Sequence, residues 1–108
     1  MRKPLVKRAA VGPSRIQGWG LIAREAVAMG ETVDESPILL TLRVPRDIGD
    51  HTYILSDGRH ALPCGDGVFV NHSDDPNVWP LPDLRRRVMR LIAVRDIAPG
   101  EEVTLNYG

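Results

Sequence analysis

A short polar stretch, residues 71–77, is notable because its side chains could hold a small polar ligand. It reads Asn-His-Ser-Asp-Asp-Pro-Asn and directly follows the apolar segment Val68-Phe69-Val70. Asn, Asp and Ser residues usually form turns by hydrogen bonding to nearby backbone. A loop that positions a ligand has the same composition, because binding residues are concentrated on loops carried by a rigid scaffold. Both interpretations stay open at this level.

Two glycines surround a tryptophan near the N-terminus, in Gly18-Trp19-Gly20-Leu21-Ile22-Ala23. The spacing matches the Gly-x-Gly-x-x-Ala fingerprint of dinucleotide sites, but that fingerprint requires a buried strand before it and a helix after it. Gly12-Pro13 interrupts the chain before the motif, and Gly30 follows it too soon for a long helix. A dinucleotide fold is therefore not expected. The two glycines still allow a ligand to lie against the backbone, or they mark a β-bulge.

The side chains that could hold a metal ion or act as a nucleophile are few. They are His60, Cys64, Asp66 and His72. Their spacing matches no zinc pattern, so no metal site is expected. Cys64 by itself is more typical of a small apolar residue in a core or pocket than of a nucleophile.

A tyrosine near the C-terminus could also contribute to a site. The segment 102–105 has the composition of a short strand, and Tyr107 follows it closely. Chain ends usually fray. A functional Tyr107 therefore requires that the rest of the fold holds this end in place.

Composition limits the classes of protein that these side chains could serve. The chain has 108 residues, enough for one domain, and its Lys plus Arg and Asp plus Glu totals are both 14. A nucleic-acid-binding domain usually carries a basic excess, so no direct nucleic-acid partner is expected. No apolar run approaches the roughly 20 residues of a membrane helix, and Lys7 and Arg8 interrupt any signal-peptide core. The single cysteine allows no internal disulfide, which fits a reducing compartment.

The charge is nevertheless distributed unevenly along the chain. The first 24 residues carry only basic charges, and a second basic cluster consists of Arg85, Arg86, Arg87 and Arg90. Acidic residues dominate between these two clusters. Patches of this kind are most often solvated faces.

Gly and Pro residues divide the chain into short pieces rich in branched side chains, which favours short strands. Asp57-Gly58 indicates a hairpin turn, and Pro99-Gly100 indicates a turn before the last strand. Only residues 24–29 and 46–50 have the composition of a helical turn, and no internal repeat is visible. The strands are predicted at residues 5–11, 20–23, 38–44, 52–55, 68–70, 88–94 and 102–105.

Three segments, taken together, carry a resemblance to a known family. They are Gly18 to Ala23, then Phe69-Val70-Asn71-His72-Ser73 with Pro76-Asn77, then Arg95-Asp96-Ile97 through Gly100-Glu101-Glu102 to Asn106-Tyr107-Gly108. In this order they resemble the SET domain, the family of protein-lysine methyltransferases. The resemblance covers residues 5–108, so we expect a single SET domain over 1–108, similar to the minimal SET proteins of viruses and bacteria.

The resemblance implies a mostly β, SET-domain-like (β-clip) fold, with small sheets around a C-terminal pseudoknot. In that pseudoknot the C-terminal segment threads under a loop near the Asn-His-Ser segment. Threading is rare in proteins. Here it would prevent the strand before Tyr107 from fraying.

The resemblance also implies an S-adenosylmethionine-dependent protein-lysine N-methyltransferase, with S-adenosylhomocysteine as its product. The backbone of Gly18, Trp19 and Gly20 would contact the cofactor. Asn71 would bind its amino-acid part and His72 its adenine. Tyr107 would be catalytic, lying where the sulfonium and the lysine meet, and Tyr53 resembles the second active-site tyrosine. The substrate channel would include Tyr53 and Leu105.

Elementary chemistry is compatible with this assignment. A free lysine has a pKa of ~10.4, so neutralising it at pH 7 costs about 4.6 kcal/mol. A nearby sulfonium and a desolvating channel both lower that pKa. A strong side-chain base is therefore not required, and the remaining work is positioning.

The sequence departs from the family pattern at two places. Leu105 stands where many members have Phe or Tyr, which predicts a pocket permissive for di- or trimethyl-lysine. The chain also ends at Gly108, without the flanking segment whose aromatic residue helps to wall the lysine channel in the family. Either a second copy supplies this wall, or the substrate does, or catalysis is weak, and our hypothesis is a homodimer. The alternative is a SET-like module that binds S-adenosylmethionine or a peptide with little turnover, and a plain β-rich interaction domain is a third reading.

The expected partner is a basic, histone-like protein or peptide that carries a lysine. Asp47, Asp50 and Asp57 could attract it if they line the channel. The resemblance and the composition predict a soluble, cytoplasmic protein of bacterial or viral type, or one located in the host nucleus. No membrane partner is expected.

Overall fold

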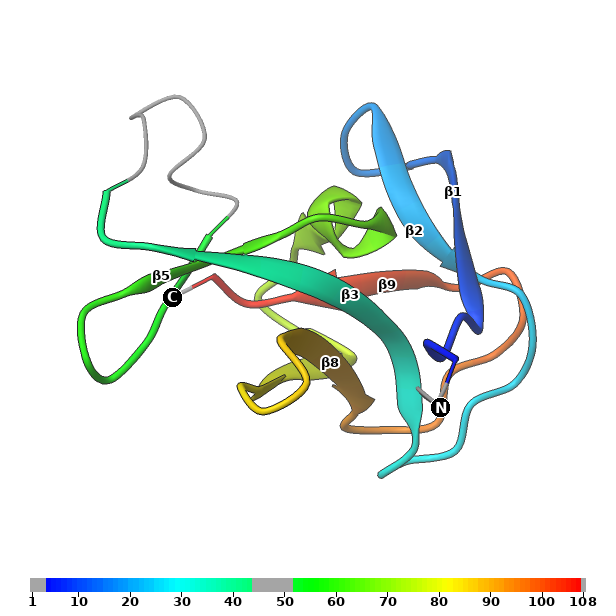
Figure 1. The fold of residues 1–108 in the computed structure, drawn as a ribbon. Helices are drawn as coiled ribbons and strands as arrows, with labels where there is room; N and C mark the ends of the chain where they lie inside the picture. The colour runs from blue at the N-terminus through cyan, green and yellow to red at the C-terminus, as the bar shows by residue number, and fades with distance from the viewer. Residues whose placement is uncertain (1–3, 44–51, 108) are drawn as a thin grey trace.

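Short strands between Gly and Pro turns build the molecule into two curved sheets (Figure 1). The computed structural model describes residues 4–43 and 52–107. Its elements are β1 (Ala9–Pro13), β2 (Trp19–Ala23), β3 (Thr32–Thr41), β4 (Tyr53–Ile54), β5 (His60–Pro63), the 3-10 turn η2 (Asp66–Phe69), β6 (Asn71–His72), β7 (Val78–Asp83), β8 (Val88–Ala93) and β9 (Glu102–Leu105). The predicted mostly β fold class is therefore confirmed.

The C-terminal strand β9 lies inside the first sheet, whose order is β1-β2-β9-β6. It pairs antiparallel with β2, where Leu21 is opposite Val103, and parallel with β6, where Asn71 is opposite Thr104. Figure 1 shows β9 crossing the middle of the molecule. A parallel neighbour so distant in sequence places the C-terminal segment beside the Asn-His-Ser loop, as the pseudoknot requires.

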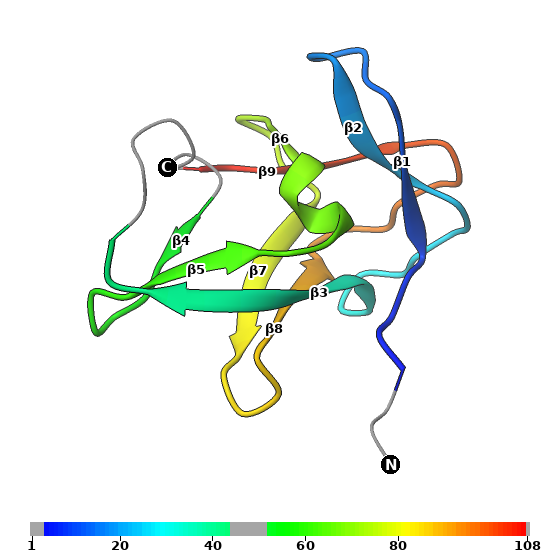
Figure 2. The same ribbon diagram turned by 45° about the horizontal axis from the view of Figure 1, so that its top comes forward.

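The second sheet has the order β4-β5-β3-β8-β7 and is built around the ten-residue strand β3. Its edge strand β7 contains Pro80 and Pro82. Proline has no N–H for a ladder bond, so it is confined to edge strands or bulges. The β7–β8 hairpin projects from the rest of the molecule, at the bottom of Figure 2.

One buried apolar cluster joins the two sheets. Burying this surface supplies the main stabilising term of the fold. Val103 and Leu105 of β9 belong to the cluster, so the C-terminal strand is part of the core. The members are Ala9, Leu21, Ala23, Val27, Val33, Val70, Val78, Leu91, Ala93, Ile97, Val103 and Leu105.

The structure also shows an internal repeat that the sequence analysis missed. Segments 21–33 and 91–103 share the runs Leu-Ile-Ala and Gly-Glu at matching positions. The two segments pair reciprocally: the Val27 N–H donates to the Ile97 carbonyl at 2.9 Å, and the Ile97 N–H returns a bond at 2.8 Å. A strand begins near the end of each copy: β3 at Thr32 in the first and β9 at Glu102 in the second. The repeat was missed because it is short and its turn holds different residues in each copy.

Several predicted elements are in place, and some are wrong. Strands occur within or close to the segments 5–11, 20–23, 52–55, 88–94 and 102–105, and the turns at Gly58 and Gly100 have positive φ. The predicted strand 68–70 is mostly the 3-10 turn η2, and residues 24–29 form bends and a bridge rather than a helical turn. The second predicted helical turn, 46–50, lies outside the described residues.

Three strands were missed and one was predicted to begin too late. Neither β5 nor the two-residue β6 was predicted, and β7 was not predicted because prolines interrupt it. β3 begins at Thr32 rather than at residue 38, because Asp34 and Glu35 are buried there as partners of basic side chains. In the part of the chain that the structure describes, no helix is long and apolar enough to cross a membrane.

Candidate active site

A groove of about 970 Å³ collects nearly all of the predicted site residues. It lies where the start of β2, the turn η2 with β6, and the end of β9 meet β4. Its volume is at the upper end of the ~300–1,000 Å³ that small-molecule sites occupy. We call it the C-terminal groove. Its lining is Gln17, Gly18, Trp19, Thr52, Tyr53, Ile54, Val68, Phe69, Val70, Asn71, His72, Pro80, Leu105, Asn106 and Tyr107.

Gly20 is the predicted site residue that does not line this groove. A Cβ there would lie 2.6 Å from Oε2 of Glu102 and 3.1 Å from Cβ of Ser14, so the space behind the loop is already filled. Gly18 needs its glycine for a different reason, because its φ of 50° is a left-handed conformation. The two glycines therefore shape the loop that carries Trp19.

Asn71 ties this loop to the C-terminal strand. Its amide Nδ2 lies 3.2 Å from the Gln17 carbonyl, 3.1 Å from the Trp19 carbonyl, 3.1 Å from Ser14 Oγ and 2.9 Å from Glu102 Oε2. An amide has two hydrogens, so these acceptors share them. Among the described residues, no side chain or backbone group bonds to Asn71 Oδ1. That oxygen can accept a hydrogen bond from a ligand.

His72 holds the backbone of Tyr107. The Tyr107 N–H donates to Nδ1 of His72 at 3.1 Å, and Nε2 of the same ring lies 2.9 Å from Asp74 Oδ1. Because Nδ1 accepts, the proton of a neutral ring belongs on Nε2, where it is donated to Asp74. The His72 and Tyr107 ring centroids are 5.7 Å apart.

The hydroxyl of Tyr107 donates to the carbonyl of Val70, next to the site loop. Burial raises the pKa of the Tyr107 phenol. Burial, together with the nearby Tyr107 and Asp34, also raises the pKa of Tyr53. Both phenols are therefore neutral at physiological pH and can donate or accept hydrogen bonds, but neither is a base.

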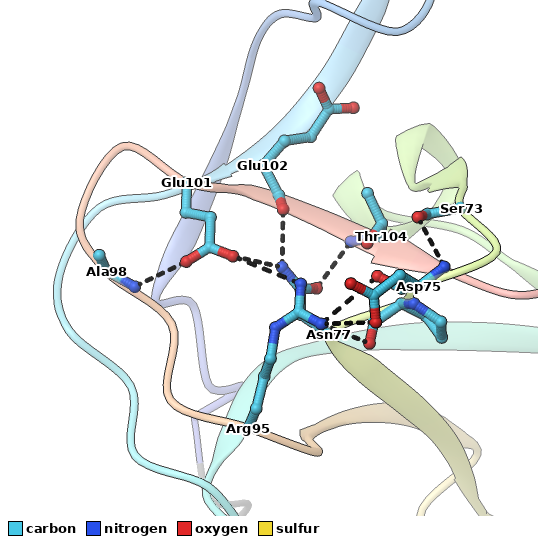
Figure 3. Close-up of polar contacts among 9 residues, drawn as sticks. Ser73, Asp75, Asn77, Arg95, Ala98, Glu101, Glu102 and Thr104 are labelled. Carbon is cyan, nitrogen blue, oxygen red and sulfur yellow. Dashed lines mark hydrogen bonds and ion pairs between the residues drawn. The ribbon is translucent and has the colours of Figure 1, made fainter.

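A second set of polar contacts fastens β9 under the loop 73–77 (Figure 3). Asn77 is fully buried. Its Nδ2 donates to the Glu102 carbonyl at 2.8 Å, and its Oδ1 accepts from the Thr104 N–H at 2.8 Å. The side chain thus takes the place of a neighbouring strand for this part of β9.

Arg95 links the loop 73–77 to the turn before β9 through ion pairs. It lies 3.1 Å from the carboxylate of Asp75 and 3.8 Å from that of Glu101. Glu101 also accepts from the Ala98 N–H at 3.1 Å, which fixes the turn before β9 (Figure 3). These contacts join the two quoted motifs, the Asn-His-Ser loop and the Gly-Glu-Glu turn.

Sequence reasoning missed Ser14, Glu102, Asp74 and Asn77 as residues that build this site. Asn77 and Glu102 stood in the quoted motifs, but the sequence assigned them no role. No sequence pattern marked Ser14 as a site residue, because its partner Glu102 is 88 positions away. The two meet only in the fold, where Ser14 Oγ donates to Glu102 Oε1 at 2.7 Å.

Other predicted features lie elsewhere. Cys64 is exposed, so the expectation of a buried cysteine is wrong. Asp57 is exposed and does not line the groove, and Asp47 and Asp50 lie outside the described residues. Within residues 4–43 and 52–107, no three His, Cys, Asp or Glu side chains gather as a metal site.

Comparisons with known proteins agree with this geometry. The model of the SET domain family matches residues 18–108. A histone-lysine N-methyltransferase of Schizosaccharomyces pombe, specific for lysine 37 of histone H3, is 26% identical over 116 aligned positions, which cover 100% of this chain and 79% of the relative. A candidate histone methyltransferase of Plasmodium falciparum has a solved structure with a TM-score of 0.80 and 28% identity, covering 94% of each chain.

A further structural match is a humanized mutant of Polycomb Repressive Complex 2 from Chaetomium thermophilum, bound to an inhibitor. Its TM-score is 0.74 and its identity 26%, and the match covers 95% of this chain but 15% of that one. The family match includes most of the chain, and the sequence relative and the first structural neighbour are both named as histone methyltransferases. The chain therefore belongs to the SET-domain family and is a protein-lysine N-methyltransferase.

Proposed function

We propose that the C-terminal groove binds S-adenosylmethionine and a substrate lysine, and that methyl transfer to the lysine amine takes place beside Tyr107. The observation that carries this proposal is the fixed position of Tyr107. Its backbone is held by His72, its hydroxyl by Val70, and its strand by Asn77. A C-terminal tyrosine held in this way can orient two reactants, and positioning of reactants supplies much of the acceleration of such reactions.

The residues of the groove fit the proposed cofactor. S-adenosylmethionine supplies an activated methyl group on a sulfonium when it is bound. Asn71 Oδ1 can accept a hydrogen bond from the ammonium group of the cofactor's amino-acid part. The backbone of Gly18 and Trp19 lines the groove and can contact the cofactor. The aromatic rings of His72 and Tyr107 can contact the adenine and the cationic sulfur, since cations are attracted to aromatic faces.

The groove contains no strong base for the lysine. Its described lining includes no Asp, Glu, Lys or Arg side chain. Nδ1 of His72 already accepts the Tyr107 N–H, so it is not available as a general base. We therefore propose that the lysine arrives at the reaction as a neutral amine because the groove is desolvated and lies next to a cation. Tyr53 and Tyr107, both neutral, would hold that amine by hydrogen bonds.

The proposed substrate is a lysine in a basic protein, of which a histone is the model. Two of the similar proteins are described as histone methyltransferases, one of them specific for histone H3. Binding without turnover is the second candidate function, and the same experiment separates it from catalysis. Homodimer formation stays a prediction, and light scattering that finds only monomer under assay conditions would contradict it.

The test is methyl transfer from labelled S-adenosylmethionine to purified histones, with Tyr107→Phe beside the wild type. We expect wild type to label lysine and Tyr107→Phe to lose turnover, with cofactor affinity within a few-fold of the wild type. Arg43→Ala, a change at an exposed arginine outside the groove, serves as the control and should behave as wild type.

Each other result of this assay has a defined meaning. Cofactor binding with no transfer to any histone or lysate protein would support the binding module instead. Absence of cofactor binding by the wild type would contradict the proposed site.

A further inference from the structure

A second groove of about 970 Å³ lies at the tip of the β7–β8 hairpin, between the segment before β1 and the first part of β3. It shares no lining residue with the C-terminal groove. We call it the arginine groove, because four arginines contribute to its wall. Its described lining is Pro4, Leu5, Val6, Thr32, Glu35, Pro37, Asp83, Arg85, Arg86, Arg87, Val88 and Arg90.

Two of these arginines are fixed by one buried carboxylate. Glu35 Oε2 lies 2.9 Å from Nη1 of Arg86 and 3.4 Å from Nε of Arg90, and Arg90 Nη2 donates to Thr32 Oγ1 at 2.9 Å. Burial disfavours the charged carboxylate, but hydrogen bonds from Arg86 and from the Val6 N–H outweigh it and lower the pKa of Glu35. The two guanidinium groups are therefore held in place before any ligand arrives.

The other two arginines have no acidic partner among the described residues. Arg85 and Arg87 flank Arg86 on the exposed turn. Arg87 has a φ of 56°, the only positive φ at a non-glycine residue in the described chain. A left-handed conformation costs about 1–2 kcal/mol in a residue with a Cβ, and Gly or Asn is the usual choice there. Arg87 therefore places a positive charge on the turn, although its left-handed backbone conformation is unfavourable for a residue with a Cβ.

The charges of the arginine groove do not cancel. Its four arginines face two acids, Glu35 and Asp83, which leaves a formal excess of two positive charges. No nucleic-acid partner was expected from the sequence, because the whole chain has no net charge. The β7–β8 hairpin nevertheless gathers four of the chain's 14 basic residues in one groove, and a local basic patch is the usual footprint of a phosphate backbone.

We propose that the arginine groove binds the phosphate backbone of a duplex nucleic acid. Guanidinium groups pair with phosphate oxygens in a bidentate fork, and a duplex offers such phosphates at high density. The described lining has no aromatic side chain, which disfavours a single strand, since single strands bind largely by stacking on aromatic rings. Leu5 and Val6 are half-buried and Val88 is buried, so the groove offers no large exposed apolar anchor for a peptide.

This site would act together with the proposed methyl transfer without depending on it. Because the two grooves share no lining residue, a duplex in the arginine groove leaves the C-terminal groove open to a lysine. The phosphates of a duplex bound there would attract a basic substrate protein and raise its local concentration near the enzyme. Duplex binding can be measured without cofactor, so its failure and the failure of methyl transfer are distinguishable.

The experiment is fluorescence anisotropy with a short mixed-sequence DNA duplex at salt concentrations from about 50 to 200 mM. Two phosphate contacts predict a slope of log affinity against log salt of roughly −2, or about a tenfold loss over this range. The double variant Arg85→Gln/Arg87→Gly removes both unpaired charges, and glycine suits the positive φ of position 87. We expect it to lose the salt dependence and at least tenfold in affinity at low salt.

Controls separate a specific groove from general basicity. Arg43→Ala removes one exposed basic charge outside the groove and should leave duplex affinity within twofold. The double variant should methylate a free peptide as the wild type does. The proposal is overturned if the wild type does not bind at about 50 mM salt, if the double variant binds equally well, or if a polyglutamate peptide binds more tightly than the duplex through the same arginines.

Discussion

Tyr107 depends on neighbours that are not themselves reactive. Its N–H reaches His72 of β6 and its hydroxyl reaches the carbonyl of Val70, just before β6, so both ends of the residue are fixed by one short segment. Asn71, one position earlier than His72, fixes the Gly18–Trp19 loop on the opposite wall. Adjacent side chains of one short strand therefore control both walls of the C-terminal groove.

The role of the hydrogen bond from the Tyr107 N–H to His72 can be tested with two variants, one that lacks an acceptor and one that keeps it. His72→Leu lacks any acceptor for the Tyr107 N–H, while His72→Asn retains an oxygen on a side chain of similar reach. We expect kcat to fall at least tenfold in His72→Leu, about 1.4 kcal/mol in barrier height, and to recover partly in His72→Asn. Cofactor affinity should change by a few-fold in both. Equal loss of kcat in the two variants would show that the hydrogen bond to Tyr107 does not matter.

Asn71 should contribute directly to cofactor affinity. Asn71→Ala removes both the free Oδ1 and the anchor of the loop, so we expect S-adenosylmethionine binding to weaken by about 1–3 kcal/mol. Arg43→Ala, at an exposed arginine outside the groove, is the control and should bind the cofactor as the wild type does. Titration calorimetry measures both variants. Unchanged affinity in Asn71→Ala would count against the assignment.

The size of the Leu105 side chain should limit the space available beside Tyr107. It is buried at the end of β9 and lines the groove, where an aromatic ring would occupy more space. We expect wild type to form di- or trimethyl-lysine and Leu105→Phe to stop at fewer methyl groups, as read by mass spectrometry of the product. Overpacking costs about 1–3 kcal/mol, so folding of the variant is checked first. A wild-type enzyme that stops at monomethyl-lysine after exhaustive reaction would contradict the prediction of a permissive pocket.

One of the two inner strands of the first sheet, β9, is the last strand in the chain. β9 has β2 on one side and β6 with the loop 73–77 on the other. The short strands themselves could be predicted, because Gly and Pro turns separate branched residues. The pairing could not be predicted from those patterns alone, since the partners are far apart in sequence. It entered the prediction only through the resemblance to a family.

The same limit explains the strand errors. Asp34 and Glu35 look like loop residues in the sequence, yet both are buried in β3. Each has a basic partner from another element: Lys7 lies 3.1 Å from Asp34, and Arg86 lies 2.9 Å from Glu35. Buried acids of this kind become acceptable only when the tertiary partner is present, and no local pattern shows that partner.

The contacts of Asn77 should outweigh those of Arg95 in holding β9. Asn77→Ala leaves the Thr104 N–H and the Glu102 carbonyl without their buried partner, so we expect a loss of about 2–3 kcal/mol in the free energy of unfolding. Arg95→Ala breaks ion pairs that are largely exposed and should lose less than about 1 kcal/mol. Urea denaturation of both variants measures this. Equal losses would mean that Asn77 does not fasten the strand.

Across the whole molecule, charge that sums to zero in the sequence is separated in space. The C-terminal groove is lined by neutral side chains among the described residues, and the arginine groove carries a basic excess. The motifs located the first groove, because the family resemblance names its residues. The arginines of the second groove were visible in the sequence as a basic cluster, but Glu35 and the segment before β1 meet them only in the fold.

Stability should depend on pH through the buried Asp34. Burial raises the pKa of Asp34 above its ordinary 3.8, although Lys7 and Ser36 oppose the shift. The unfolded chain therefore releases this proton at lower pH than the folded protein does, and the contribution of Asp34 to stability falls as pH rises from 3.8 through the folded pKa. Asp34→Asn cannot ionise and lacks this dependence. Urea denaturation of both proteins over that range should give curves that diverge, and parallel curves would contradict the assignment.

The most direct test of the proposed cofactor site is an NMR titration of the isotope-labelled protein with S-adenosylmethionine. We expect the shifted amides to lie in residues 17–20, 71–73 and 106–107, around the C-terminal groove, with the arginine groove unaffected. Absence of shifts at saturating cofactor, or shifts confined to residues outside the C-terminal groove, would contradict the claim that cofactor and lysine meet beside Tyr107.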